Sequence, residues 1–116
     1  MCNRATLNKI TDKVVQVAHE SLGSKLDKVI LYGSYARGDF DNESDIDIMI
    51  LANIPHADEV KEYKKINRFV SRLGLEHDML ITVNITACTM FYRFLDDMPF
   101  FKNIQQEGVV LCANGQ

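Results

Sequence analysis

The sequence predicts an α/β domain in which helices pack on a small sheet. Two long segments carry apolar residues at three- and four-residue steps, which indicates amphipathic helices. Three shorter runs are rich in Ile, Val and Leu and are bounded by turn-forming or charged residues, which is typical of strands. These segments alternate along the chain, as they do in layered α/β proteins.

The elements follow from these patterns in chain order. Leu7, Ile10, Val14 and Val17 predict a first helix over residues 6–22, which Gly23 ends. The later elements are a strand over 28–32, a turn-rich loop over 33–44, a strand over 45–51, a helix over 57–73, a strand over 78–85, a helix over 87–98, a short helix opened by Pro99, and an edge strand over 109–111.

The connections predict how the strands pair. The loop over 33–44 is long enough to return the second strand antiparallel to the first. The helix between the second and third strands is the crossover that parallel strands require. The fold class is therefore α/β (α+β), with a mixed sheet of three to four strands.

Length and charge narrow the function classes. The 116 residues fit one domain over residues 1–116. Lys and Arg number 13 against 16 Asp and Glu, a net charge of −3. Direct binding of nucleic acid is disfavoured, because neutralising phosphates requires an excess of clustered basic residues. The 47% of hydrophobic residues excludes a disordered chain.

The cysteines and the apolar runs predict a compartment. Cys2, Cys88 and Cys112 are odd in number and widely spaced, which argues against a disulfide framework and against a zinc site. No apolar stretch has the length of a membrane span or the placement of a secretory signal. We therefore expect a cytoplasmic protein with reduced cysteines and no membrane contact.

The residues that predict chemistry are Gly33-Ser34, followed after ten residues by Asp45-Ile46-Asp47. Side chains alternate along a strand, so Asp45 and Asp47 point to one face and Ile46 to the other. Adjacent carboxylates repel each other, and a divalent cation with oxygen ligands relieves that repulsion. Glycine and serine in a turn expose backbone N–H groups and a hydroxyl that suit a phosphate.

A third acid is expected beside this pair. Asp78 opens the predicted third strand, and if that strand is parallel to the second, Asp78 lies level with Asp45 and Asp47. Three carboxylates can hold two Mg²⁺ ions about 3.5–4 Å apart. Glu76 is two residues away on the same face of an extended chain, so it can share the role of Asp78.

At these residues the chain resembles the nucleotidyltransferase superfamily of DNA polymerase beta, and GSYARGDFDNESDIDIMI is similar to its signature. The details most resemble the minimal nucleotidyltransferases, many of which act as the antitoxin of a helical HEPN-domain protein. The resemblance implies a nucleotidyltransferase fold. It also implies that Gly33 and Ser34 hold the triphosphate, that Asp45, Asp47 and Asp78 are catalytic metal ligands, and that Arg37 contacts phosphate. Arg37 can instead form a salt bridge with Asp39 or Asp41.

The resemblance implies an Mg²⁺-dependent enzyme that moves a nucleotide, by preference AMP from ATP, to an acceptor hydroxyl. The acceptor is expected on a HEPN-type partner, because the chain has no evident acceptor domain. Two alternatives stay open: an antitoxin that blocks its partner by contact alone, and a transferase for small molecules such as aminoglycosides, whose acceptor site a homo-oligomer could supply. The aromatic segment from Phe91 to Phe101 is either core or a docking patch.

Overall fold

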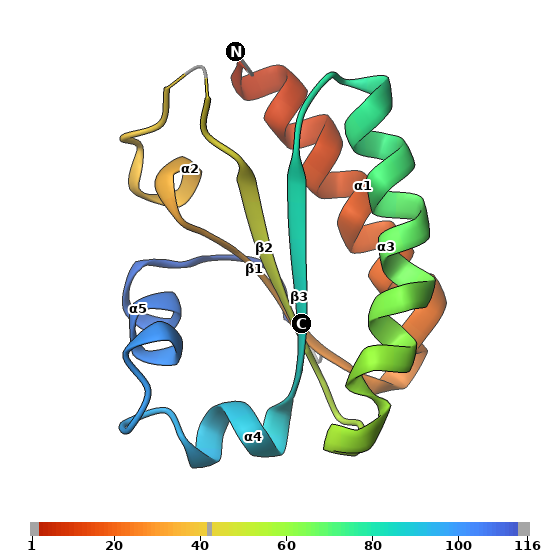
Figure 1. Cartoon of the computed structure of the whole chain (residues 1–116), viewed down its shortest axis with the longest axis vertical. Helices are drawn as coiled ribbons and strands as arrows, with labels where there is room; N and C mark the ends of the chain where they lie inside the picture. The colour runs from red at the N-terminus through yellow and green to blue at the C-terminus, as the bar shows by residue number, and fades with distance from the viewer. Residues whose placement is uncertain (1–2, 42, 114–116) are drawn as a thin grey trace.

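The computed structural model describes residues 3–41 and 43–113, which form a four-stranded sheet between two layers of helices (Figure 1). Helices α1 (Arg4–Leu22) and α3 (Glu59–Glu76) lie side by side on one face of the sheet, and α4 (Cys88–Arg93) and α5 (Pro99–Glu107) lie on the other (Figure 1). The remaining elements are β1 (Leu26–Tyr32), β2 (Ile46–Ala52), β3 (Ile81–Ala87), β4 (Val109–Ala113), the helical turn α2 (Ser34–Arg37) and the 3₁₀ turns η1 (Gly23–Lys25) and η2 (His56–Asp58).

The sheet has the predicted mixed topology, with the strand order β3-β2-β1-β4. β1 is antiparallel to β2 and to β4, and β2 is parallel to β3. The register pairs Tyr32 with Asp47 and Asp47 with Thr82. Paired residues share a face of the sheet, so these three side chains form one row across β1, β2 and β3.

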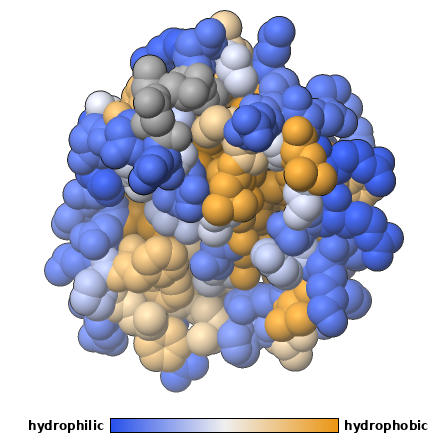
Figure 2. Space-filling model, turned by 45° about the horizontal axis from the view of Figure 1, so that its top comes forward, coloured by the Kyte–Doolittle hydropathy of each residue, from blue (hydrophilic) through white to orange (hydrophobic). Residues whose placement is uncertain are grey.

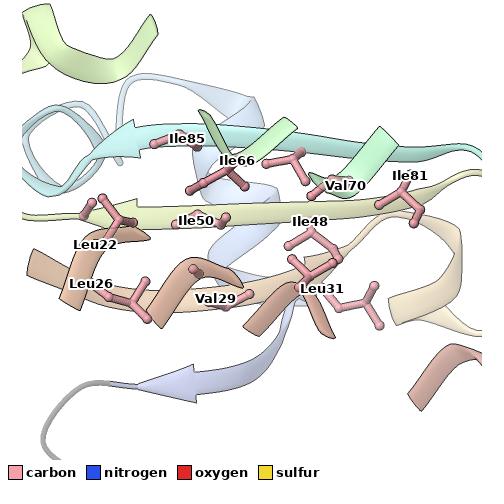
Figure 3. Close-up of a cluster of buried hydrophobic side chains, with 14 of the residues drawn as sticks. Leu22, Leu26, Val29, Leu31, Ile48, Ile50, Ile66, Val70, Ile81 and Ile85 are labelled. Atoms are coloured by element: carbon pink, nitrogen blue, oxygen red, sulfur yellow. The ribbon is translucent and has the colours of Figure 1, made fainter. Parts of the chain in front are cut away.

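β2 lies at the centre of the hydrophobic core. Ile46, Ile48 and Ile50 are fully buried and belong to the cluster that α1 and α3 cover. Figure 3 shows Ile48 and Ile50 beside Ile66 and Val70 of α3. The intervening side chains of β2 point to the other face, where α4 and α5 cover Met49 and Leu51. A strand buried on both faces has a nearly continuous apolar sequence, which explains the run IMILA at 48–52.

The aromatic segment divides between core and surface. Phe91 is 2% exposed and packs in a second, smaller cluster with Ile104. Phe101 packs against this cluster. Met98 and Phe100, in contrast, are 42% and 41% exposed. The segment is therefore core around Phe91 and exposed at Met98 and Phe100, so neither core packing nor a docking patch describes all of it.

Three predicted elements had clearly wrong bounds. The helix predicted over 87–98 is the short helix α4, which ends at Arg93. Residues 34–37, expected as loop, form the helical turn α2, because the amide N–H groups of Ala36 and Arg37 both bond to the Gly33 carbonyl at 3.1 Å. The third strand begins at Ile81 instead of Asp78, because α3 continues to Glu76 and a turn follows it.

Two further findings concern the cysteines and the helices of the described residues. Cys88 and Cys112 are free thiols, while Cys2 lies outside the residues that the structure describes. None of the helices within residues 3–41 and 43–113 combines the length and the apolar character that crossing a membrane requires.

Gly74 is the position where α3 packs most closely against the turn that leads to β3. A Cβ atom there would lie 2.5 Å from the backbone oxygen of Met79. Overpacking of this kind costs about 1–3 kcal/mol, against a gain in helix propensity of about 1 kcal/mol for alanine. We therefore expect Gly74→Ala to lower the free energy of unfolding by about 1 kcal/mol net in urea titrations.

The matched control is Ser71→Ala, an exposed substitution one turn earlier in α3. It should stabilise the protein slightly, because propensity is the only property that changes. A Gly74→Ala variant as stable as Ser71→Ala would contradict the close packing at this position.

Candidate active site

The site begins where β1 ends at Gly33. Gly33 has φ +76° and ψ −156°, a backbone conformation that is strongly disfavoured for residues other than glycine. The conformation reverses the chain into α2 and directs Ser34 and Arg37 over the end of β1. Gly38 closes α2 in the left-handed conformation, and its N–H donates to the Ser34 carbonyl at 2.8 Å.

Gly33 lies directly against Asp47. A Cβ atom at Gly33 would overlap the Oδ2 atom of Asp47. The contact exists because β1 and β2 are antiparallel with Tyr32 opposite Asp47, which brings the start of β2 beside the end of β1. The structure therefore brings together the turn and the carboxylate that the sequence separates by more than ten residues.

Asp45 and Asp47 form the pair of carboxylates that the sequence predicts. Both are half-buried, and Asp47 occupies the row between Tyr32 and Thr82. Burial raises the pKa of Asp47, the negative charge of Asp45 raises it further, and Arg37 partly opposes both effects. Burial and then Asp47 raise the pKa of Tyr32 to about 12, so this phenol is neutral at physiological pH. Negative charge is thus concentrated where a cation would relieve it.

Arg37 has two acidic partners. Its Nε atom lies 3.1 Å from Oδ2 of Asp39, and its Nη1 atom lies 3.6 Å from Oε2 of Glu107 on α5. Both contacts are exposed, so each contributes little to stability. The salt bridge with Asp39 is thus present, and the guanidinium lies at the edge of the site, where its charge reaches Asp47.

A cleft of about 380 Å³ joins these groups. One wall consists of the Gly33 turn with Ser34, Arg37, Tyr32 and Asp47, and α5 provides the other. The volume lies within the range of small-molecule sites.

The structure does not bring Asp78 to the carboxylate pair. Asp78 is exposed, has φ +53°, and lies in the turn three residues before β3 begins. Thr82, not an acid, is the β3 residue paired with Asp47. Within residues 3–41 and 43–113, no three His, Cys, Asp or Glu side chains are arranged to hold a metal ion. The expected level position of Asp78 was wrong because the strand starts later, and its catalytic role stays a prediction, as does that of Glu76.

The carboxylate pair nevertheless fits a magnesium ion that arrives with a nucleotide. Mg²⁺ is commonly held by one or two carboxylates together with substrate phosphates and water. Asp45 and Asp47 meet that requirement, and the raised pKa of Asp47 is the property that a bound cation would reverse. A second ion would require oxygen ligands beyond this pair.

Sequence reasoning missed five residues that line the cleft, among them Ile104, which also anchors α5 to the sheet. The sequence indicates no site role for Tyr32 at the end of β1, nor for the α5 residues Phe100, Asn103 and Glu107. A signal for the last three was present, because spacings of three and four residues place them on one face of a helix. Nothing in the sequence indicated that this face would lie opposite Gly33.

The raised pKa of Asp47 predicts a pH-dependent effect on stability. The folded state binds this proton more tightly than the unfolded chain, so stability is lost as the pH rises from the ordinary value of 3.8 through the raised value. Above that window, Asp47→Asn should raise the free energy of unfolding by on the order of 0.5 kcal/mol, given solvent screening. The gain should disappear at pH values below the window.

Urea titrations in EDTA at several pH values measure this difference. Asp12→Asn, an exposed substitution on α1, is the control and should show no comparable gain. A neutral-pH loss of stability in Asp47→Asn would show that the Asp47 carboxylate is stabilised by the fold instead of strained by it.

Comparisons with known proteins show the family to which this chain belongs. The family model described as "Nucleotidyltransferase domain" matches residues 12–110. "Putative protein adenylyltransferase MJ0141" of Methanocaldococcus jannaschii is 46% identical over 77 residues, which cover 66% of this chain and 76% of that protein.

Two crystal structures share the fold at 19% identity. A "putative nucleotidyltransferase from Sulfolobus solfataricus" aligns with a TM-score of 0.59 over 91% of this chain and 79% of its own. A structure described as "the toxin-antitoxin with AMP-PNP" aligns with a TM-score of 0.56 over 91% and 75%. Because the family model covers most of the chain and a relative is 46% identical, this chain belongs to the nucleotidyltransferase domain family and is a nucleotidyltransferase.

Proposed function

We propose that this enzyme transfers AMP from Mg²⁺-bound ATP to a hydroxyl group of a partner protein, and that this transfer neutralises the partner as a toxin. The name of the relative in M. jannaschii, protein adenylyltransferase, supports the nucleotide and the acceptor class. The structural neighbour described as a toxin–antitoxin with AMP-PNP supports the biological setting. The resemblance noted in the sequence favours a HEPN-type partner.

The observation that supports the chemistry most directly is the contact of the Gly33 backbone with the Asp47 carboxylate. A phosphate-binding turn and a cation-binding carboxylate are useful together only if one ligand reaches both. A metal-bound triphosphate is such a ligand, since its phosphates suit the turn and its cation suits the acids.

In the proposed reaction, the acceptor oxygen forms a bond to the α-phosphorus while the bond from that phosphorus to the β-phosphate oxygen breaks. Pyrophosphate leaves, and the hydroxyl proton passes to solvent. Bound Mg²⁺ would neutralise charge on the transferring group and lower the pKa of the attacking hydroxyl. Asp45 and Asp47 would hold the cation, while Gly33, Ser34 and Arg37 would orient the phosphates. Positioning and charge supply most of the catalysis in phosphoryl chemistry.

Arg37 would exchange partners when a nucleotide binds. Its present contacts with Asp39 and Glu107 are exposed and weak, so a phosphate can compete for the guanidinium at little cost. The same exchange would remove the Arg37 charge that now offsets the acids around Asp47.

The direct test is incubation with Mg²⁺ and α-labelled ATP, with and without the product of the neighbouring gene. We expect label on the partner protein, and none when the γ-phosphate carries the label. Asp47→Asn should lower the transfer rate at least about 100-fold, because it removes a charged ligand from the site.

Asp12→Asn, far from the cleft on α1, is the matched control and should keep full activity. Asp78→Asn in the same assay tests the predicted third ligand, which gains support if activity falls as far as in Asp47→Asn. A stable complex with the neighbour but no label would favour the contact-only antitoxin, and label on an aminoglycoside would favour the small-molecule alternative.

Gly33 and Gly38 offer a matched pair for testing the turn. Both have positive φ, but only at Gly33 would an added Cβ overlap another group, the Asp47 carboxylate. Gly33→Ala should displace this carboxylate and lower the transfer rate about 100-fold, as small misplacements in catalytic sites do. Gly38→Ala introduces left-handed strain without the overlap and should keep most of the activity.

Thermal unfolding of both variants provides the necessary control, because each substitution strains the backbone by about 1–3 kcal/mol. Equal losses of activity in two equally folded variants would contradict a specific role for the contact between Gly33 and Asp47.

A further inference from the structure

The α5 wall of the cleft has a feature that the proposed reaction does not use. Phe100, Asn103 and Glu107 line the cleft from one face of α5. Between them Ile104, 2% exposed, anchors the helix to the sheet. The three cleft-facing side chains are an aromatic ring, an amide and a carboxylate, and all three remain exposed.

Contacts across the cleft order these three residues. Glu107 lies 3.6 Å from Arg37, so its end of α5 adjoins the phosphate-binding turn. The ring of Phe100 lies 5.7 Å from that of Tyr32, edge to face. Tyr32 is paired with Asp47, so the Phe100 end of α5 adjoins the carboxylates. The two ends are about 10 Å apart at 1.5 Å per residue.

This order fixes how a nucleoside triphosphate can lie in the cleft. With its terminal phosphates near Ser34 and Arg37 and its α-phosphate near Asp47, its remaining part, the nucleoside, extends toward Phe100 and Asn103. The side chains there match a nucleoside, because aromatic rings stack on bases and an Asn amide can donate to and accept from the edge of a purine.

Surface character agrees with this assignment. Phe100 is 41% exposed although it lies in a cleft with polar walls. Moderately hydrophobic side chains gather at the lower left of Figure 2, the side on which α4 and α5 lie in Figure 1. An exposed ring beside carboxylates is well suited to the flat, apolar face of a base.

We propose that α5 forms the nucleoside subsite of the cleft, in which Phe100 stacks on a purine base and the Asn103 amide bonds to its edge. The assignment rests on the proposed function only in taking a nucleoside triphosphate as the ligand. Glu107 does not bind the nucleoside in this proposal. Its carboxylate pairs with Arg37 until a phosphate of the nucleotide replaces it.

The test compares binding of Mg²⁺-ATP with binding of Mg²⁺-tripolyphosphate, which has the phosphates but no nucleoside. By calorimetry, Phe100→Ala and Asn103→Ala should each weaken ATP binding about tenfold and leave tripolyphosphate binding unchanged. Asn103→Ala should also narrow the preference for ATP over UTP, whereas Phe100→Ala should weaken both nucleotides. The control is Phe69→Ala, which truncates a 52% exposed ring on α3, on the other face of the sheet. It should change the affinity for neither ATP nor tripolyphosphate.

Two results would overturn the subsite: ATP binding unchanged in both variants, or equal weakening of ATP and tripolyphosphate. The proposed function fails separately. A parent protein that binds ATP with these variant effects but transfers no label refutes the transfer reaction and keeps the subsite, and a parent that binds neither ligand refutes both.

Discussion

The site depends on one constraint, the antiparallel register that places Tyr32 opposite Asp47. Side chains alternate along both strands, so a slip of one residue would turn Asp47 into the core under α1 and move its isoleucine neighbours to the face that α4 and α5 cover. The same slip would separate Asp47 from the Gly33 backbone. The apolar packing of the sheet and the approach of turn and carboxylate are therefore set together.

The carboxylates of Asp45 and Asp47 lie at the start of β2, which is the most buried strand of the sheet. Ile46 and Ile48, on either side of Asp47, are both completely buried. Their packing against α1 and α3 holds the backbone of β2, so the repulsion between Asp45 and Asp47 cannot move it. Burial, and then the negative charge of Asp45, instead raise the pKa of Asp47. The buried strand thus keeps two like charges close together.

Much of this arrangement follows from sequence patterns. The alternation in DIDIMIL predicts one polar and one apolar face, and the loop and crossover lengths predict the mixed sheet, because each is a local property of the chain. Asp78 could not be placed in the same way. The extent of α3 and the left-handed turn at Asp78 decide where β3 begins, and neither leaves a periodic signal. The position of α5 beside the cleft could not be predicted for a related reason, since it depends on tertiary packing through Ile104.

The row of Tyr32, Asp47 and Thr82 runs across the sheet from β1 through β2 to β3, and its two ends differ in their surroundings. The Gly33 turn and α5 lie on the β1 side of Asp47, while Thr82 on the β3 side is exposed. Displacement at phosphorus sets the attacking and leaving oxygens roughly opposite each other. In the proposed reaction, pyrophosphate would leave over β1 and the acceptor would arrive over β3, so a partner protein docked there would not obstruct the exit of the product. Substrate entry and product departure would then use separate sides of one small domain.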